Sequence, residues 1–299
     1  MELFIIKKVI FKGSAVAVVT PFKEDGSVNF GVLEKLIEFH IDNNTDAIVS
    51  CGTTGESATL SEKEYLEILD FTVKKVNKKI PVIAGSGSNN TKHALELSNQ
   101  AEKLGVDGLV VVTPYYNKTS QLGLVRHYFH IADNINTPVI LYNVPSRTGC
   151  NILPETYLKL SEHPNIIAVK EANGDISSVA KTISLCKKDL YVYSGNDDQT
   201  LPILSLGGIG VISVFANIFP RVSHDIVDKF FSGDIKSSMK LQIKYLKLMN
   251  SLFLDINPIP VKEALNILKF EVGKCRLPLV DLEHNNILKL KNILKSYTN

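Results

Sequence analysis

The segment Ile166-Ile167-Ala168-Val169-Lys170-Glu171-Ala172-Asn173-Gly174 combines a structural signal with a chemical one. Its first four residues are apolar and mostly β-branched, which predicts a buried strand of a parallel sheet, and Gly174 predicts the turn after it. Lys170 closes the strand. Burial favours the neutral form of an amine, which is a nucleophile toward carbonyl groups. Taken alone, Lys170 would be read as a surface lysine at a strand edge; segments at matching strand ends favour the chemical interpretation.

The strand at Ile166–Lys170 belongs to a series. Short apolar runs recur along the chain, and each is followed by a polar turn and an amphipathic stretch that predicts a helix. The expected strands are Ala15–Thr20, Ala47–Cys51, Val82–Gly85, Gly108–Thr113, Val139–Asn143, Ile166–Lys170, Leu190–Ser194 and Gly210–Val214. The expected helices between them are Phe30–Asn43, Ser61–Asn77, Thr91–Leu104, Gln121–Ile135, Pro154–His163, Ile176–Cys186 and Gln199–Leu206.

Strict alternation of strand and helix predicts a parallel sheet, and eight repeats favour a closed (β/α)8 TIM barrel over an open doubly wound sheet. After Val214 the strands stop, and four helical stretches follow without a Gly/Ser linker. We therefore expect a catalytic barrel over residues 1–230 and a C-terminal helical appendage, residues 231–299, packed on it. The four expected C-terminal helices are Arg221–Phe231, Ile235–Leu254, Pro260–Leu268 and Asn285–Ser296.

Composition excludes several classes of function. A formal net charge of +2 over 299 residues argues against nucleic acid as the main partner. The four cysteines are scattered without a Cys-x-x-Cys pair, which fits a reducing compartment and buried thiols, and no His-Glu-x-x-His occurs. The apolar start, Met1 to Ile10, is too short to span a membrane and is interrupted by lysines. We expect a cytoplasmic protein with no metal, no other cofactor and no membrane partner.

In barrel enzymes the chemistry lies on the loops after the strands. The second predicted strand is followed by Gly52-Thr53-Thr54-Gly55-Glu56-Ser57, in which backbone N–H groups and threonine hydroxyls can converge on a carboxylate. Gly85-Ser86-Gly87 follows the third strand, but Asn90 stands where a dinucleotide fingerprint needs its third glycine, which argues against nucleotide binding.

The fourth and fifth strands end in aromatic segments. Thr113-Pro114-Tyr115-Tyr116-Asn117-Lys118 carries two adjacent tyrosines that point in different directions, so one can face a site and the other an interface. In Leu141-Tyr142-Asn143-Val144-Pro145-Ser146-Arg147-Thr148-Gly149, a tyrosine at a strand end is a candidate proton donor and acceptor. The guanidinium of Arg147 suits a carboxylate, although a structural ion pair is the commoner role for a single arginine.

The seventh strand ends in Ser194-Gly195-Asn196-Asp197, and the eighth is entered through Gly207-Gly208-Ile209-Gly210, glycine-rich edges at which backbone carbonyls can line a pocket. Together these features predict that a lysine amine condenses with a keto acid whose carboxylate the Gly-Thr-Thr-Gly loop holds. Tyrosine and threonine hydroxyls would move the protons, and the resulting enamine would attack a second carbonyl.

With these motifs, the chain resembles the dihydrodipicolinate synthase family of the pyruvate-dependent class I aldolases, a superfamily that includes N-acetylneuraminate lyase. The resemblance extends from Gly13-Ser14 to Asn257-Pro258-Ile259-Pro260-Val261-Lys262. Gly-Thr-Thr-Gly-Glu and the strand-six lysine are shared across the superfamily, whereas Pro-Tyr-Tyr-Asn-Lys and Tyr-Asn-Val-Pro-Ser-Arg-Thr-Gly are more specific to the synthase. The residues before Phe11 have no obvious counterpart in the family.

The resemblance implies a lyase of lysine and diaminopimelate biosynthesis that condenses pyruvate with L-aspartate 4-semialdehyde, and a homotetramer built as a dimer of dimers. It implies that Lys170 forms the Schiff base with pyruvate and that Tyr142 is the general acid and base, in a proton relay with Thr53 and a neighbouring subunit's Tyr116. It also implies that Thr54 binds the pyruvate carboxylate and Arg147 the semialdehyde carboxylate, while the main chain at Ile212 and Gly195 lines the pocket.

In lysine-inhibited members of the family, an effector site at the tight-dimer interface includes two histidines and a glutamate. The matching positions here hold Glu62, Tyr65 and His93, while Ser57, Ala58, Asn89 and Tyr115 fit. Because a glutamate in place of a histidine changes both charge and donor capacity near a cationic ligand, we expect inhibition by lysine to be weak or absent.

Two alternatives remain open. A sister aldolase, such as N-acetylneuraminate lyase or a 2-keto-3-deoxy-sugar-acid aldolase, would keep Lys170, Tyr142 and the threonine loop but would not need Arg147. A catalytically inactive barrel that binds pyruvate or serves a structural role would not need the intact set of Lys170, Tyr142, Thr53 and Tyr116.

Overall fold

A closed barrel of eight parallel strands forms the centre of the protein, as the alternating pattern predicts. The computed structural model describes residues 7–298, so the first six residues of the N-terminal segment lie outside the described part. Each strand pairs with its neighbours in sequence, and β8 closes the ring by pairing with β1. The strands are β1 (Gly13–Ala17), β2 (Ala47–Ser50), β3 (Val82–Gly85), β4 (Gly108–Val112), β5 (Val139–Asn143), β6 (Ile166–Glu171), β7 (Tyr191–Ser194) and β8 (Gly210–Ser213).

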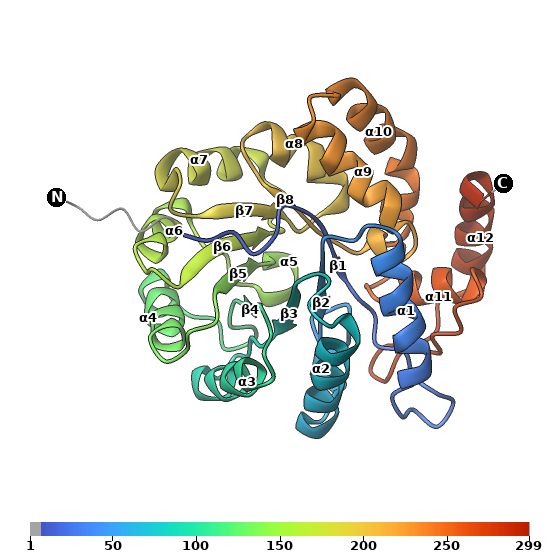
Figure 1. Cartoon of the computed structure of the whole chain (residues 1–299), viewed down its shortest axis with the longest axis horizontal. Helices are drawn as coiled ribbons and strands as arrows, with labels where there is room; N and C mark the ends of the chain where they lie inside the picture. Colours follow the sequence, from blue (N-terminus) through green and yellow to red (C-terminus); the bar gives the residue numbers. More distant parts are fainter. Residues whose placement is uncertain (1–6, 299) are drawn as a thin grey trace.

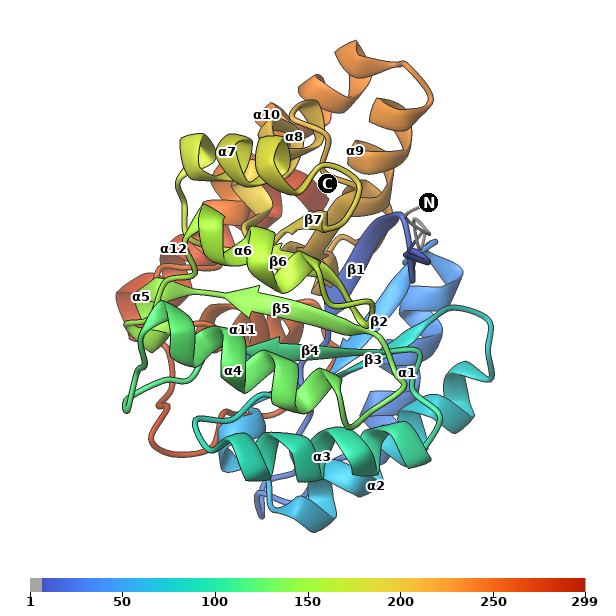
Figure 2. The same ribbon diagram turned by 90° about the vertical axis from the view of Figure 1, so that its left-hand side faces the viewer.

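Helices surround the barrel (Figure 1). The helices α1–α8 are α1 (Phe30–Asp42), α2 (Glu62–Val76), α3 (Thr91–Lys103), α4 (Gln121–Ala132), α5 (Pro145–Thr148), α6 (Pro154–Ser161), α7 (Ile176–Cys186) and α8 (Thr200–Ser205). The remaining helices are α9 (Pro220–Phe231), α10 (Ile235–Ser251), α11 (Ile259–Ile267) and α12 (His284–Thr298). Single turns of 3₁₀-helix, η1 (Ser57–Thr59), η2 (Asp197–Gln199) and η3 (Phe215–Asn217), follow β2, β7 and β8. In Figure 2, α5 lies at the end toward which β5 points.

Two apolar clusters hold this arrangement. The barrel interior contains alternate strand residues such as Ala15, Ile83, Ile140 and Ile212. The larger cluster lies between the strands and the helices. Because a parallel strand is buried on both faces, it needs apolar residues at consecutive positions, which is the pattern of the runs in the sequence.

The first strand shows the difference between burial and pairing. The apolar run predicts a strand over Ala15–Thr20, but β1 covers Gly13–Ala17. Val18 and Val19 are buried, yet the N–H of Val19 donates to the side-chain Oδ1 of Asn217 at 3.1 Å rather than to a neighbouring strand. The run therefore marks buried chain, and its pairing ends earlier.

Local capping fixes where α2 begins. The Ser61 side chain accepts from the N–H of Glu64, and the Glu64 carboxylate accepts from the N–H of Ser61, which together form a capping box. The end of the helix is set by Asn77, which adopts a left-handed conformation.

The N-terminal end of the barrel is closed by Lys7. This lysine is 7% exposed, and its Nζ donates to the backbone carbonyls of Ser161, Ile166 and Asp189. These carbonyls lie at the end of α6, the start of β6 and just before β7. Burial lowers the pKa of Lys7 to about 8. A single amine therefore satisfies three backbone acceptors at the base of the barrel.

Aromatic and aliphatic contacts continue this closure. The rings of Phe11 and Tyr193 stack with centroids 4.4 Å apart, and the Tyr193 hydroxyl donates to the Phe11 carbonyl at 2.6 Å. Ile10 lies so close to Gly108 that a Cβ on that glycine would come within 2.4 Å of its Cδ1. The segment Lys7–Phe11, here called the N-terminal plug, is thus packed into the base of the barrel.

The C-terminal helices pack on the barrel and on one another, with α10 against α9 and α12 against both α10 and α11. The four cysteines are free; three are buried, and Cys275 is partly buried. Within residues 7–298, no helix is long and apolar enough to cross a membrane.

Candidate active site

Lys170 and Tyr142 lie side by side at the C-terminal ends of β6 and β5. The two residues are paired in the register of these strands, and the Nζ of Lys170 lies 4.3 Å from the centre of the Tyr142 ring. Both side chains are buried, at 7% and 8% exposure. Tyr193 pairs with Lys170 from the other side, on β7. A lysine amine and a phenol, both shielded from bulk water, therefore share one end of the barrel.

The loop after β2 approaches this end as a tight turn. Thr54 is 2% exposed, and Thr53 lines the neighbouring cavity. The carbonyl of Gly55 accepts from the Thr20 hydroxyl at 2.7 Å, and Glu56 adopts a left-handed conformation with φ 55°. Because a bulky residue reaches that region only at some cost, the surrounding contacts must hold the loop in shape.

The contact that holds Glu56 is a buried ion pair with α11. The Nζ of Lys262 lies 2.8 Å from Oε1 of Glu56, and the two side chains are 2% and 1% exposed. Oε2 of Glu56 accepts from the N–H of Arg276 at 2.9 Å, and Lys262 also donates to the Lys274 carbonyl at 2.7 Å. Burial lowers the pKa of Lys262, although Glu56 opposes this shift. The pair attaches the threonine loop to the C-terminal helices.

Asn257, on the segment between α10 and α11, connects two predicted binding residues. Its Nδ2 donates to the Thr54 hydroxyl at 3.0 Å, and its backbone carbonyl accepts from Nη2 of Arg147 at 2.9 Å. Asn257 is 5% exposed, whereas Arg147, near the end of α5, is exposed. Thr54 and Arg147 are therefore linked through one residue.

The ends of β7 and β8 complete the rim. The N–H of Gly195 donates to the Glu171 carbonyl at 2.7 Å, and a Cβ at position 195 would come within 2.8 Å of the Ala172 side chain. Only glycine fits there. Asp197 is 4% exposed, and its carboxylate accepts from the Ser213 hydroxyl at 2.5 Å. This contact fixes the residue that follows Ile212, while burial raises the pKa of Asp197.

A second buried carboxylate lies next to Lys170 in sequence but makes different contacts. Glu171 accepts from the Tyr157 hydroxyl at 2.6 Å and from Nδ2 of Asn143 at 2.9 Å. It is 3% exposed, and burial raises its pKa to about 7. These contacts join the ends of β5 and β6 to α6.

The two adjacent tyrosines differ in how far they are exposed. Tyr115 is 39% exposed and lines the cavity next to the threonine loop. Tyr116 is 93% exposed and has φ 68°, a left-handed conformation that is uncommon for an aromatic residue. Within one chain, Tyr116 is therefore not brought to Lys170.

A cavity of about 520 Å³ extends from the threonine loop across α2 and α3. Thr53 and Arg147 line it together with six of the predicted effector residues, namely Ser57, Ala58, Glu62, Tyr65, His93 and Tyr115. Nδ1 of His93 lies 3.7 Å from Oε1 of Glu62. Asn89, the seventh, is instead partly buried, and its carbonyl accepts from Nδ2 of Asn117 at 3.0 Å. Thr53 and Arg147 thus border the same space as six of the predicted effector positions, whereas Lys170, Tyr142 and Thr54 are not part of its lining.

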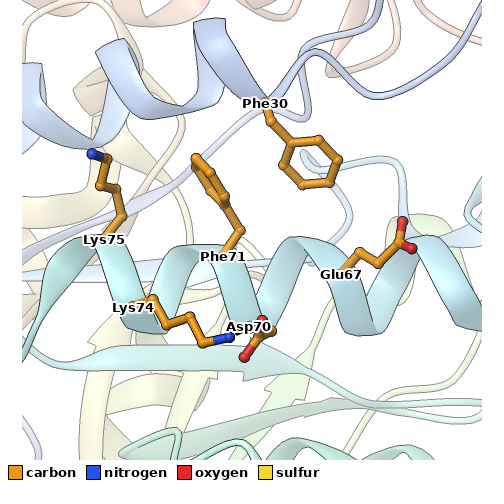
Figure 3. A pocket seen from close by; sticks show the side chains of 6 residues that line it. All are labelled: Phe30, Glu67, Asp70, Phe71, Lys74 and Lys75. Carbon is orange, nitrogen blue, oxygen red and sulfur yellow. Dashed lines mark hydrogen bonds and ion pairs between the residues drawn. The ribbon is translucent and has the colours of Figure 1, made fainter.

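A second groove, of about 620 Å³, lies on the outside of the barrel between α1 and α2 (Figure 3). Phe30 and Phe71 are part of its lining and pack against each other, with ring centroids 5.1 Å apart. None of the predicted site residues lines this groove. It is a surface feature of helix packing, separate from the strand ends.

Sequence reasoning assigned no role to Asn257, Lys262 or Asp197. Asn257 and Lys262 stand at the two ends of the motif Asn257-Pro258-Ile259-Pro260-Val261-Lys262, which marked the extent of the resemblance and was the only signal available. Asp197 was quoted as part of the strand-seven end, and its burial is the information that the sequence lacked.

Comparison with known proteins agrees with this geometry. The family model described as the dihydrodipicolinate synthetase family matches residues 10–297. The 4-hydroxy-tetrahydrodipicolinate synthase 1 of Clostridium acetobutylicum is 57% identical over 288 residues, covering 96% of this chain and 98% of the relative. The crystal structure of dihydrodipicolinate synthase from Aquifex aeolicus superposes with a TM-score of 0.94 at 42% identity, covering 96% of this chain and 98% of that one.

The dihydrodipicolinate synthase of Cyanidioschyzon merolae, described with lysine bound, has a TM-score of 0.93 at 40% identity and covers 97% of this chain and 99% of its own. The match over nearly the whole length, together with a strand-six lysine beside a strand-five tyrosine, identifies the protein at the level of family. The chain belongs to the dihydrodipicolinate synthetase family.

Proposed function

We propose that this protein is a lyase that condenses pyruvate with L-aspartate 4-semialdehyde to give 4-hydroxy-tetrahydrodipicolinate, on the route to diaminopimelate and lysine. The observation that carries the proposal is the buried Lys170 amine 4.3 Å from the centre of the Tyr142 ring. The relatives named as 4-hydroxy-tetrahydrodipicolinate synthases support the substrates. A reducing cytoplasm is the proposed location, which the four free thiols support.

In the proposed mechanism, the Lys170 amine attacks the keto carbon of pyruvate and water leaves, giving an imine. Loss of a methyl proton converts the imine to an enamine, whose carbon attacks the aldehyde carbon of the semialdehyde. Tyr142, with Thr53, moves the protons in these steps because it is the phenol next to the reacting amine. Hydrolysis or intramolecular displacement by the substrate amine then frees Lys170 as the product cyclises.

Two carboxylates must be held during this sequence. Thr54 is the proposed donor to the pyruvate carboxylate, with the main chain at Gly195 and Ile212 lining the pocket. Arg147 is the proposed partner of the semialdehyde carboxylate, because its guanidinium lies at the edge of the cavity that adjoins the threonine loop. One of its nitrogens is already bonded to the Asn257 carbonyl, which limits its movement.

We propose a homotetramer in which Tyr116 completes the proton relay of a neighbouring subunit. Its 93% exposure and left-handed backbone support this, because an exposed aromatic side chain on a strained loop is well suited to insertion into a partner. Mixed oligomers test the proposal. Lys170→Ala and Tyr116→Phe subunits, each nearly inactive alone, should recover activity when refolded together, since a Lys170→Ala subunit donates an intact Tyr116. Failure to recover any activity in verified mixed oligomers would place Tyr116 outside the relay.

The experiment that tests the function is pyruvate consumption with L-aspartate 4-semialdehyde, run beside N-acetylmannosamine as a sugar acceptor. We expect turnover with the semialdehyde alone, and borohydride should trap a pyruvate adduct on Lys170. Arg147→Ala should retain the adduct and lose semialdehyde turnover. Turnover with the sugar would favour a sister aldolase, and no adduct would favour an inactive barrel.

A further inference from the structure

Asn257 is the only described residue whose hydrogen bonds reach both Thr54 and Arg147. Its side-chain amide donates to the Thr54 hydroxyl, 203 positions away in sequence, at 3.0 Å. Its backbone carbonyl accepts from Arg147 at 2.9 Å. The amide therefore serves one of the two proposed carboxylate sites, and the carbonyl serves the other.

The direction of the first bond matters for chemistry. A threonine hydroxyl has one proton to donate and two lone pairs that accept. When Asn257 donates to Thr54, a lone pair is occupied and the hydroxyl proton stays free to donate to an anion. Without that bond, a buried hydroxyl would turn its proton toward the nearest protein acceptor. The proton would then no longer be available to donate to the ligand.

Both sides of the contact are held independently. Glu56, two positions after Thr54, and Lys262, five positions after Asn257, form the buried ion pair at 2.8 Å. The loop and the α10–α11 segment therefore remain adjacent if the amide is removed. In addition, Oδ1 of Asn257 is buried and has no hydrogen-bond partner among the described residues, although Asn257 lines the cavity. An amide retained only for stability would have both of its polar atoms satisfied.

We propose that Asn257 is a positioning residue that orients the Thr54 hydroxyl for the pyruvate carboxylate while its carbonyl holds Arg147 at the acceptor site. This inference rests on the proposed function. Truncating the side chain should weaken pyruvate binding, since the amide is lost, and should leave the acceptor site nearly unchanged, since the carbonyl is retained.

The test is a cycle of Asn257→Ala, Thr54→Val and the double variant. The pyruvate concentration that half-saturates borohydride trapping at Lys170 is measured without semialdehyde, followed by KM and kcat for both substrates. Asn257→Ala should raise the half-saturating pyruvate concentration by about 3- to 10-fold, the range expected for one hydrogen bond, and change the semialdehyde KM by less than about 2-fold. If Asn257 acts through Thr54, the double variant should be no weaker than Thr54→Val alone.

Asn266→Ala is the matched control, because the Asn266 amide, on α11, donates to the Gly273 carbonyl beyond the helix at the same 3.0 Å, and Asn266 lies outside the cavity lining. It should leave pyruvate trapping unchanged. If Asn257→Ala does not fold, Asn257→Asp keeps the shape and the carbonyl but accepts from Thr54 instead of donating. It should weaken trapping at least as much.

Additive effects in the cycle, or unchanged trapping in Asn257→Ala, would overturn the proposal. A change confined to the semialdehyde KM would also overturn it, because the side chain would then act through Arg147. These outcomes are distinct from failure of the proposed function, in which the wild-type protein itself forms no pyruvate adduct or has no turnover with the semialdehyde.

Discussion

Replacing Lys262 with methionine is expected to destabilise the protein strongly. The change leaves the Glu56 carboxylate, 1% exposed in its side chain, without the ammonium 2.8 Å away. Removing one partner of a buried ion pair costs about 3–5 kcal/mol, because the remaining charge stays desolvated. For a chain of this length that corresponds to a decrease in Tm of about 5–8 °C. The assay is thermal and urea denaturation at fixed protein concentration, since an oligomer's stability depends on concentration.

The control for this prediction is a second substitution in the same pair. Glu56→Gln combined with Lys262→Met removes both charges and should be more stable than Lys262→Met alone. An exposed pair provides the matched comparison: Lys63 and Glu67 lie 3.9 Å apart with side chains 83% and 49% exposed, so Lys63→Met should shift Tm by no more than about 1 °C. If Lys262→Met were as stable as Lys63→Met, or if the double variant were less stable than the single, the reasoning from an uncompensated buried charge would be wrong.

Three further outcomes are expected. Burial lowers the pKa of His40 to about 3, so between that pH and about 6.5 the unfolded chain binds a proton that the folded chain does not, and stability is lost as pH falls. The free energy of unfolding of His40→Gln should therefore rise by about 2 kcal/mol relative to wild type between pH 7.5 and pH 5 in urea titrations; a constant difference would mean that His40 has the same pKa in the folded and the unfolded chain. Deleting residues 1–9 should lower Tm, because the carbonyls of Ile166 and Asp189 lose their donor, while the KM for pyruvate stays unchanged; altered kinetics would show that the plug affects the opposite end of the barrel. Lysine at millimolar concentration should inhibit weakly or not at all, since Glu62 lies beside His93 in the cavity, and a full inhibition curve would contradict this.

The sequence predicted the barrel because each strand is a short apolar run ending at a turn, and that signal is local. Strand β6 is an example, because its apolar residues Ile166 to Val169 are all buried. The observed strand extends one residue beyond the predicted one, to Glu171. The ends of β5 and β6 were expected to be neighbours, because equivalent ends of parallel strands meet at one edge, and Lys170 pairs there with Tyr142.

Contacts between distant segments could not be read in the same way. The pairing of Glu56 with Lys262 joins residues 206 positions apart, and neither residue has a local pattern that names its partner. Lys7 is a similar case, because a lysine near the chain start resembles a solvated residue until three carbonyls are found around it. The roles of the catalytic and binding residues remain predictions, to be tested by the substitutions above.

The N-terminal plug has a consequence for the order in which the molecule is assembled. Lys7 is separated from Ile166 by 159 positions and from Asp189 by 182. During synthesis at about 5–20 residues per second, its acceptors do not exist until roughly 10–40 s after Lys7 itself is made. The first part of the described chain must therefore remain solvated while six strands, β1 to β6, are synthesised. Lys7 cannot complete its native contacts before the chain has been synthesised to the start of β7.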